Sequence, residues 1–234
     1  MLVLCYHALS DRWPAALSTT PELFEAQLGL LLRRGYRPTT FEQALKEPQP
    51  KTLAVTFDDA YRSVIDLARP IMERLGVPGT VFAPTDWVGR EDPMRWDGID
   101  QWLGGPHEHE LLCMDWAQLR ELADGGWEVG SHTLSHPHLT QIDDGSLTRE
   151  LAESRSACEE GMGRPCHSIA YPYGDVDARV IAATRAAGYD FGASLPKRFG
   201  STDPLDWPRV GVYHVDDLRR FKLKVSRLTR RVRR

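Results

Sequence analysis

Cysteine is scarce in this sequence, and long apolar runs are missing from it. The four cysteines are widely spaced and form no Cys-x-x-Cys pair, which argues against a zinc finger and against a disulfide-stapled scaffold. No stretch of roughly 18 apolar residues is present, so we predict no transmembrane helix. The first residues also lack the basic start and the apolar core of a signal peptide. We therefore expect a cytoplasmic protein.

Strong charge of one sign is absent as well, except near the C-terminus. The net charge of −4 over 234 residues argues against a nucleic-acid partner. Residues 219–234 are strongly basic, and we set them apart as a C-terminal tail. This tail is predicted to be a solvated chain end or, alternatively, a weak contact with an acidic membrane or partner. Residues 1–218 are predicted to form one domain, because their number is ordinary for a single core.

The sequence does contain a regular alternation of short apolar runs with helical segments. The runs are rich in β-branched and aromatic residues, and the segments between them carry apolar faces at helical spacing. This alternation is typical of a parallel sheet with crossover helices, so the predicted class is α/β. The predicted strands cover residues 2–6, 53–57, 80–83, 127–131, 168–171, 189–194 and 209–213.

Several local signals bound the helices and one long loop. Thr19 and Glu22 form a predicted capping box for the first helix, and Gly35 ends that helix in a left-handed conformation. Pro70 predicts a kink or break in the second helix. Residues 84–112 break the alternation and are rich in glycine, proline and tryptophan. We predict a long loop there, of the kind that shapes substrate access.

Polar side chains able to do chemistry follow the predicted strands at their carboxyl ends. In an α/β barrel these ends converge on one face, where active sites are built. Residues that are far apart in the sequence are therefore expected to meet at one site. They are His7, Asp58, Asp59, His132, His136 and Tyr173.

The pair His132 and His136 suggests a metal site. If their segment forms a helical turn, the two imidazoles lie on one side, and a neighbouring carboxylate completes a facial set of three ligands. Alone, such a pair is more often an ordinary surface or core pair. The adjacent carboxylates of Asp58 and Asp59 favour the metal site, because burying both calls for a compensating cation. One of them also has an alternative role as a helix N-cap.

Three segments carry a family resemblance. The TFDD of residues 56–59, the HTLSH of residues 132–136 and the AYPYG of residues 170–174 resemble, in order and spacing, the first three motifs of the polysaccharide deacetylase family of carbohydrate esterases. The LCYH of residues 4–7 resembles the start of a circularly permuted branch of that family. The similarity extends over nearly the whole chain and implies a distorted (β/α)7 barrel, the NodB-like deacetylase fold.

The resemblance also implies a role for each motif residue. Asp58 is implied to be the general base, and the backbone N–H of Tyr173 is implied to stabilise the oxyanion. The implied cofactor is one divalent metal ion, with zinc as the default and cobalt, nickel, manganese or iron as alternatives. Its implied protein ligands are Asp59, His132 and His136.

Two positions depart from the family pattern. The usual histidine acid near the C-terminus is replaced by VYH at residues 212–214, so either His7 or His214 is the candidate acid, and we favour His7. A role in capping or packing the first strand remains the alternative for His7. Ala170 stands where the family has an arginine that tunes the base. Arg209 is a candidate substitute, the alternative being an ordinary exposed barrel residue.

The expected function is metal-dependent hydrolysis of the N-acetyl group of an amino sugar, with release of acetate. Residues 1–218 are then the catalytic domain, and the expected partner is a carbohydrate such as a polysaccharide containing N-acetylglucosamine or a glycan precursor. Two alternatives remain open. One is hydrolysis of another acetyl ester or of a non-peptide amide, and the other is a catalytically inactive domain that binds glycans.

Overall fold

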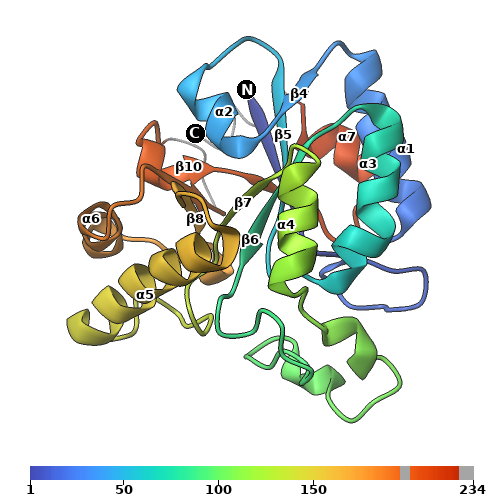
Figure 1. Ribbon diagram of the computed structural model, residues 1–234. Helices are drawn as coiled ribbons and strands as arrows, with labels where there is room; N and C mark the ends of the chain where they lie inside the picture. Colours follow the sequence, from blue (N-terminus) through green and yellow to red (C-terminus); the bar gives the residue numbers. More distant parts are fainter. Residues whose placement is uncertain (196–200, 227–234) are drawn as a thin grey trace.

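A single nine-stranded sheet organises the molecule, and every pairing in it is parallel (Figure 1). The computed structural model describes residues 1–195 and 201–226. The strands are β1 (Leu2–Tyr6), β4 (Arg37–Thr39), β5 (Thr52–Phe57), β6 (Gly79–Ala83), β7 (Glu128–Ser131), β8 (Ser168–Ala170), β9 (Phe191–Ser194), β10 (Trp207–Pro208) and β11 (Val210–Gly211). Their order in the sheet is β10-β9-β8-β7-β6-β5-β1-β11, with β4 also paired to β5.

The two ends of this sheet belong to one short segment of chain. Strand β10 pairs with β9 and strand β11 pairs with β1, and only Arg209 separates β10 from β11. Residues 207–211 therefore bridge the two sides of a nearly closed barrel. The predicted distorted (β/α) barrel is confirmed, and all seven predicted strands are found within about two residues of their expected bounds.

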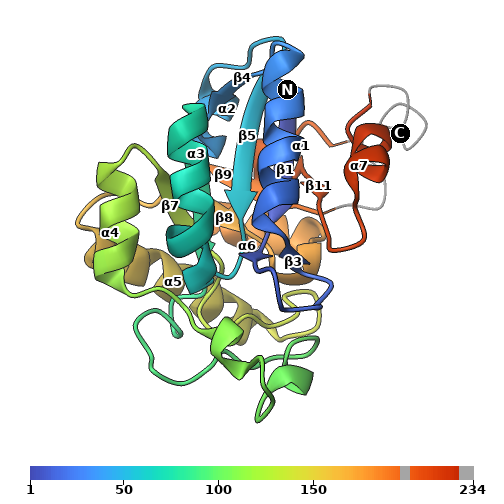
Figure 2. The same ribbon diagram turned by 90° about the vertical axis from the view of Figure 1, so that its right-hand side faces the viewer.

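The helices lie around the outside of the sheet. They are α1 (Pro21–Arg33), α2 (Phe41–Lys46), α3 (Arg69–Leu75), α4 (Trp116–Asp124), α5 (Asp144–Met162), α6 (Ala178–Ala186) and α7 (Leu218–Lys224). Figure 2 shows α1 and α3 side by side over β5. A π-helical turn at Val64–Ala68 leads into α3, which confirms the break predicted from Pro70.

Some boundaries differ from the prediction. The side chain of Thr20, rather than that of Thr19, caps α1 by accepting a hydrogen bond from the Leu23 N–H, because Thr19 is held in a short strand. That strand, β3 (Ser18–Thr19), pairs with β2 (Ala8–Leu9) in a separate two-stranded sheet. Elements this short carry too few residues to show a period, and β2, β3, β4 and β10 were not predicted.

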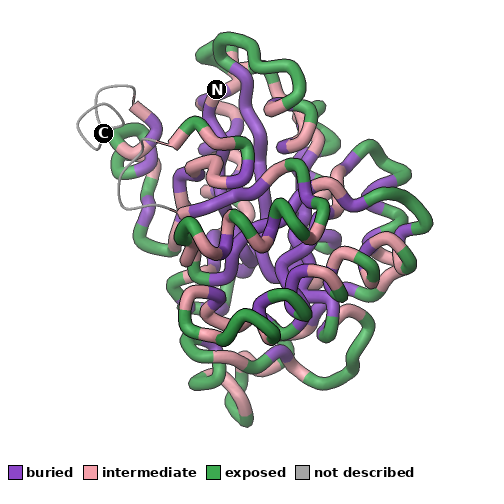
Figure 3. The backbone as a smooth tube through the Cα atoms, turned by 90° about the vertical axis from the view of Figure 1, so that its left-hand side faces the viewer, coloured by how far each residue is buried: buried purple, intermediate pink, exposed green. Residues whose placement is uncertain are grey.

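The 84–112 segment is a long loop, as expected. It contains two short 3-10 turns, Asp100–Trp102 and Glu108–Leu111. Two more such turns, Pro172–Gly174 and Pro204–Asp206, follow β8 and precede β10. Figure 3 shows that the buried backbone runs through the centre of the molecule, while the exposed stretches lie in the outer loops and helices.

The core explains why strand β5 is apolar along its whole length. All six of its residues are buried, because one face points into the barrel and the other is covered by helices. Phe57 of β5 stacks on Trp127 at a centroid distance of 5.8 Å. Phe221 is also fully buried, so α7 packs against the domain across the boundary drawn at residue 218. The tail beyond residue 226 lies outside the described residues.

All four cysteines are buried free thiols. Among the described residues, none of the helices is long and apolar enough to cross a membrane.

Candidate active site

The carboxyl ends of the strands bring the predicted site residues to one end of the barrel. Every one of them is buried except Tyr173, which is 37% exposed. They are His7 after β1, Asp58 and Asp59 after β5, His132 and His136 after β7, Tyr173 after β8, and Arg209 between β10 and β11.

Asp59, His132 and His136 form a cluster with the chemistry of a metal site. The Asp59 Oδ1 atom lies 3.3 Å from His132 Nε2 and 3.4 Å from His136 Nε2. One candidate ligand atom from each residue lies within 4.8 Å of the other two. Asp59 Oδ1 is buried and has no hydrogen-bond partner, which is costly for a carboxylate in the absence of a cation.

A backbone hydrogen bond fixes the tautomer of His132. Its Nδ1 lies 2.8 Å from the carbonyl oxygen of Ala170, so the ring proton is assigned to Nδ1 and the lone pair of Nε2 faces Asp59. Burial lowers the pKa of His136 to about 3, which keeps that imidazole neutral. One carboxylate and two imidazole nitrogens are a ligand set that suits a borderline divalent ion, so these residues fit the implied metal.

The segment between the two histidines is not a helical turn. Thr133 and His136 both have positive φ, at 66° and 68°, so the loop doubles back to bring the rings within 4.9 Å. The buried carboxylate of Glu150 on α5 holds this loop, accepting hydrogen bonds from the N–H groups of Leu134 and Ser135 and from the Ser135 hydroxyl. The helical turn considered for this segment is therefore wrong, although the side chains of His132 and His136 do lie close together.

Asp58 is held by Arg209 in a buried ion pair. The guanidinium donates from Nη1 to Oδ1 at 2.6 Å and from Nη2 to Oδ2 at 2.8 Å, and also donates to the hydroxyl of Thr56. Burial alone would raise the pKa of Asp58, but the charge of Arg209 holds it well below its ordinary value. Arg209 is only 1% exposed, so the alternative of an ordinary exposed barrel residue is wrong.

The backbone after β5 excludes a capping role for Asp59. Helical backbone begins at Arg62 and continues into the π-helical turn at Val64–Ala68. Asp59 and Ala60 lie earlier, in left-handed conformations with φ of 66° and 50°. This strained turn points the Asp59 side chain toward the histidines, and the N-cap alternative is wrong for this residue.

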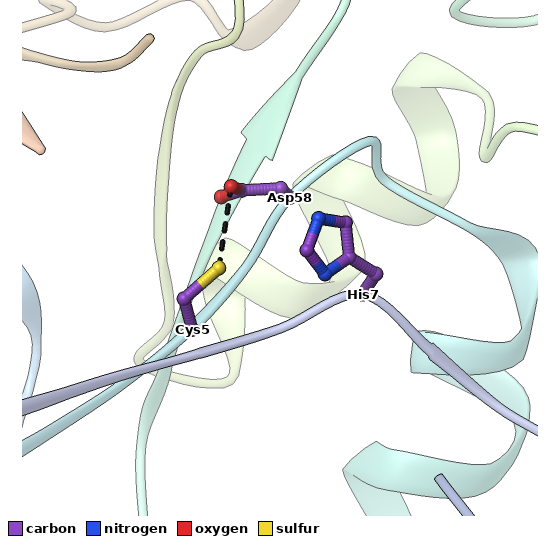
Figure 4. Close-up of side chains that lie close together, drawn as sticks. All are labelled: Cys5, His7 and Asp58. Atoms are coloured by element: carbon purple, nitrogen blue, oxygen red, sulfur yellow. Dashed lines mark hydrogen bonds between the residues drawn. The ribbon is translucent and has the colours of Figure 1, made fainter. Parts of the chain in front are cut away.

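Of the two candidate acids, His7 is the one placed beside Asp58. One ring nitrogen of His7, the Cys5 sulfur and a carboxylate oxygen of Asp58 all lie within 4.8 Å of one another (Figure 4). His7 is 9% exposed, its Nδ1 has no hydrogen-bond partner, and burial lowers its pKa. His214 is exposed, and its backbone N–H bonds to Ala16.

Two aromatic rings contact His136. Trp96, from the 84–112 loop, stacks on His136 at a centroid distance of 4.1 Å. The ring of Tyr173 stacks on His138 at 3.7 Å, and its hydroxyl donates to the carbonyl oxygen of Asp97. Tyr173 has a φ of 59°, which turns the chain directly after β8. The long loop thus contacts the metal cluster and the turn after β8.

The next residue shows how tightly that turn is built. Gly174 has a φ of 72°, and a Cβ atom there would lie 2.5 Å from the Cβ of Leu195. Only glycine satisfies both constraints.

Two supporting residues escaped the sequence reasoning. Glu150 lies in the middle of a helix, where nothing in the local pattern separates it from a solvent-facing glutamate. Cys5 could have been found, because Cys5 and His7 are two residues apart, and alternate residues of a strand share a face.

The chain is similar to several known proteins. The profile described as polysaccharide deacetylase matches residues 45–192. YxkH of Bacillus subtilis, named for a polysaccharide deacetylase, is 25% identical over 207 residues, which cover 86% of this chain and 66% of YxkH. The poly-beta-1,6-N-acetyl-D-glucosamine N-deacetylase of Staphylococcus aureus is 23% identical, over 82% of this chain and 67% of that protein.

A solved structure gives a similar result. BA0330 of Bacillus anthracis, also named for a polysaccharide deacetylase, superposes with a TM-score of 0.78 at 26% identity, over 96% of this chain and 68% of that chain. The chain therefore spans about two thirds of the length of these relatives. The matched profile includes the motifs after β5, β7 and β8, whereas His7 and Arg209 lie outside it.

Proposed function

The chain belongs to the polysaccharide deacetylase family of hydrolases, and from this premise we propose that it removes the N-acetyl group from N-acetylglucosamine residues of a polysaccharide. One observation carries the proposal. Asp58 and Asp59 are adjacent buried carboxylates with different surroundings. Asp58 is paired with Arg209. Asp59 faces two imidazoles, and its Oδ1 atom has no hydrogen-bond partner. The first can accept a proton, and the second can hold a cation.

Asp59, His132 and His136 are the residues that would hold the metal, for which zinc is our choice. A divalent ion bound there supplies positive charge that polarises the acetamide carbonyl and lowers the pKa of water. The chain contributes a preset ligand arrangement, because the Ala170 carbonyl orients His132 and Trp96 covers His136.

Asp58 is proposed to be the general base. Its low pKa keeps the carboxylate ionised at neutral pH, and Arg209 keeps it in one orientation. It would accept a proton from the water molecule whose oxygen bonds to the acetamide carbon. The carbonyl oxygen then gains negative charge, which the backbone N–H of Tyr173 is proposed to stabilise.

His7 is proposed to be the general acid. When the C–N bond breaks, the leaving sugar nitrogen needs a proton, because an amine anion is a very poor leaving group. His7 lies in the same group of side chains as Asp58. Burial lowers the pKa of His7, while the negative charges of Asp59 and Asp58 favour the protonated imidazole that would donate to the leaving nitrogen. The products are acetate and a free amino sugar.

The relatives and the aromatic side chains beside the cluster support the proposed substrate class. A relative that is 23% identical is named for the deacetylation of poly-beta-1,6-N-acetyl-D-glucosamine. In this chain, Trp96 and Tyr173 are partly exposed rings beside the cluster, and the flat faces of such rings suit the apolar faces of sugar rings. We therefore propose a glycan built from N-acetylglucosamine as the substrate.

The test is acetate release by zinc-loaded protein. The substrates are β-1,6-linked and β-1,4-linked N-acetylglucosamine oligomers and a simple acetyl ester. We expect release from an oligomer, a decrease of about 100-fold or more in Asp58→Asn, and loss on chelation that zinc reverses. Asp66→Asn, which changes an exposed aspartate on the following helical turn, is the matched control and should keep full activity.

A second matched pair tests the acid. His7→Ala should lower kcat strongly, whereas His214→Ala should leave it unchanged. Zinc-loaded protein that releases no acetate from either oligomer contradicts the proposed function. Release from the acetyl ester alone would instead favour the esterase alternative.

A further inference from the structure

A third side chain contacts the carboxylate of Asp58. The thiol of Cys5 lies 3.3 Å from Asp58 Oδ2 and 3.7 Å from the carbonyl oxygen of Tyr6. The single S–H proton is assigned to Asp58 Oδ2, because this acceptor is the closer one and is charged (Figure 4). Cys5 is fully buried in β1, and burial raises the pKa of its thiol, so the sulfur keeps its proton. The backbone of Cys5 is held between Thr56 on β5 and Gly211 on β11.

The hydrogen bonds to Asp58 can be counted atom by atom. An ionised carboxylate has about four acceptor positions, two on each oxygen. Arg209 occupies one position on Oδ1 and one on Oδ2, and Cys5 occupies a second position on Oδ2. After these three hydrogen bonds, one acceptor position remains, and it belongs to Oδ1.

We propose that Cys5 is a positioning residue that makes Oδ1 the proton-accepting atom of Asp58. The inference rests on the proposed function, in which Asp58 is the base. Arg209 fixes the plane of the carboxylate, but without the thiol Oδ2 would offer a competing position for the water proton. With the thiol in place, Oδ1 offers the one free acceptor position of Asp58. The water molecule can then donate its proton in a single orientation, which favours proton transfer.

The same residues do not make a second metal site. Candidate ligand atoms of Cys5, His7 and Asp58 do lie within 4.8 Å of one another. However, the guanidinium of Arg209 already bonds to both oxygens of Asp58, and its positive charge opposes a cation there. A thiol with a raised pKa is also a poor ligand, because metals bind the thiolate.

The kinetic test compares Cys5→Ala with Cys5→Ser in the zinc-loaded protein. Alanine removes the donor, and we expect kcat to fall on the order of tenfold with an unchanged KM and unchanged zinc affinity. Serine keeps a donor, so most of kcat should return. Cys158→Ala is the matched control, because it truncates a buried thiol in a different part of the core and should leave kcat unchanged.

A spectroscopic test follows the hydrogen bond itself. The S–H stretching band of Cys5 is isolated by subtracting the infrared spectrum of Cys5→Ala from that of the wild type. This band should shift in Asp58→Asn, because the charged acceptor is lost. A band that does not move overturns the proposal.

The outcomes separate this inference from the proposed function. If the wild type releases acetate and Asp58→Asn does not, while Cys5→Ala matches the wild type in kcat, the positioning role is wrong and the function stands. If the wild type releases no acetate from any substrate, the proposed function fails and the positioning role fails with it.

Discussion

At the scale of single residues, the buried pair of Asp58 and Arg209 sets both stability and chemistry. Replacing Arg209 with glutamine leaves a carboxylate buried without its cation. We expect the free energy of unfolding to fall by about 3–5 kcal/mol at about pH 7, measured by urea denaturation. Adding Asp58→Asn to the Arg209→Gln variant should recover part of this loss, because the neutral amide needs no counter-ion.

The pH dependence of this loss follows from the direction of the pKa shifts. In the wild type, Arg209 lowers the pKa of Asp58, which stabilises the fold above the unfolded pKa, and this contribution is lost as pH falls through the folded pKa. In Arg209→Gln, burial without a cation raises the pKa of Asp58, so ionisation opposes folding above that pKa. The difference between the two proteins should therefore shrink from about pH 7 to about pH 5. An equal difference at both pH values would contradict this account.

At the scale of elements, α5 supports the loop that carries both histidines. Glu150→Ala removes the acceptor of two buried backbone N–H groups and of the Ser135 hydroxyl. We expect zinc affinity to fall by about 10–100-fold, measured by competition with a chelating dye, because the ligands lose their support. Ser135→Ala removes only the hydroxyl contact and should change the affinity little. Equal losses in the two variants would show that the backbone contacts are unimportant.

The elements also show what could be predicted from the sequence. Strand β5 was predictable because its six consecutive buried residues leave a clear apolar run in the sequence. The left-handed conformation at the end of α1 was predictable because Gly35, whose φ is 75°, is the residue type that most readily adopts it. Strand β4 was not, since Arg37–Thr39 is short and partly exposed. The boundary error at Thr19 and Thr20 has the same origin, because both residues are good N-caps and tertiary pairing of β3 decides between them.

The candidate site was predictable to the extent that strand ends converge. Asp58 and His132 were recognised because each directly follows a predicted strand. Arg209 was recognised as a substitute, from the last predicted strand, for the arginine that is missing at Ala170. The contacts between them depend on backbone conformations that no local pattern reveals. The positive φ values at Asp59 and His136 aim those side chains at one another, and neither residue type requires such a conformation.

At the scale of the whole molecule, the segment that closes the barrel also supplies a residue of the site. Residues 207–211 pair with β9 through β10 and with β1 through β11. Arg209 lies between these pairings, and its backbone N–H donates to the carbonyl oxygen of Ser194. The segment that joins the two sides of the sheet thus delivers the guanidinium to Asp58. Loss of this ion pair should therefore weaken closure as well as the site.

The cluster of Asp59, His132 and His136 is expected to lower stability where the Asp58–Arg209 pair raises it, because a buried carboxylate oxygen without a hydrogen-bond partner is unfavourable in the absence of a cation. Zinc that binds the folded state at a concentration of about 100 times its Kd adds about 2.7 kcal/mol to stability. For 234 residues this should raise Tm by about 5–11 °C in differential scanning calorimetry. Asp59→Asn should lose most of this increase, whereas Asp66→Asn should keep it and a chelator should reverse it. The same increase in Asp59→Asn would place the bound zinc elsewhere on the protein.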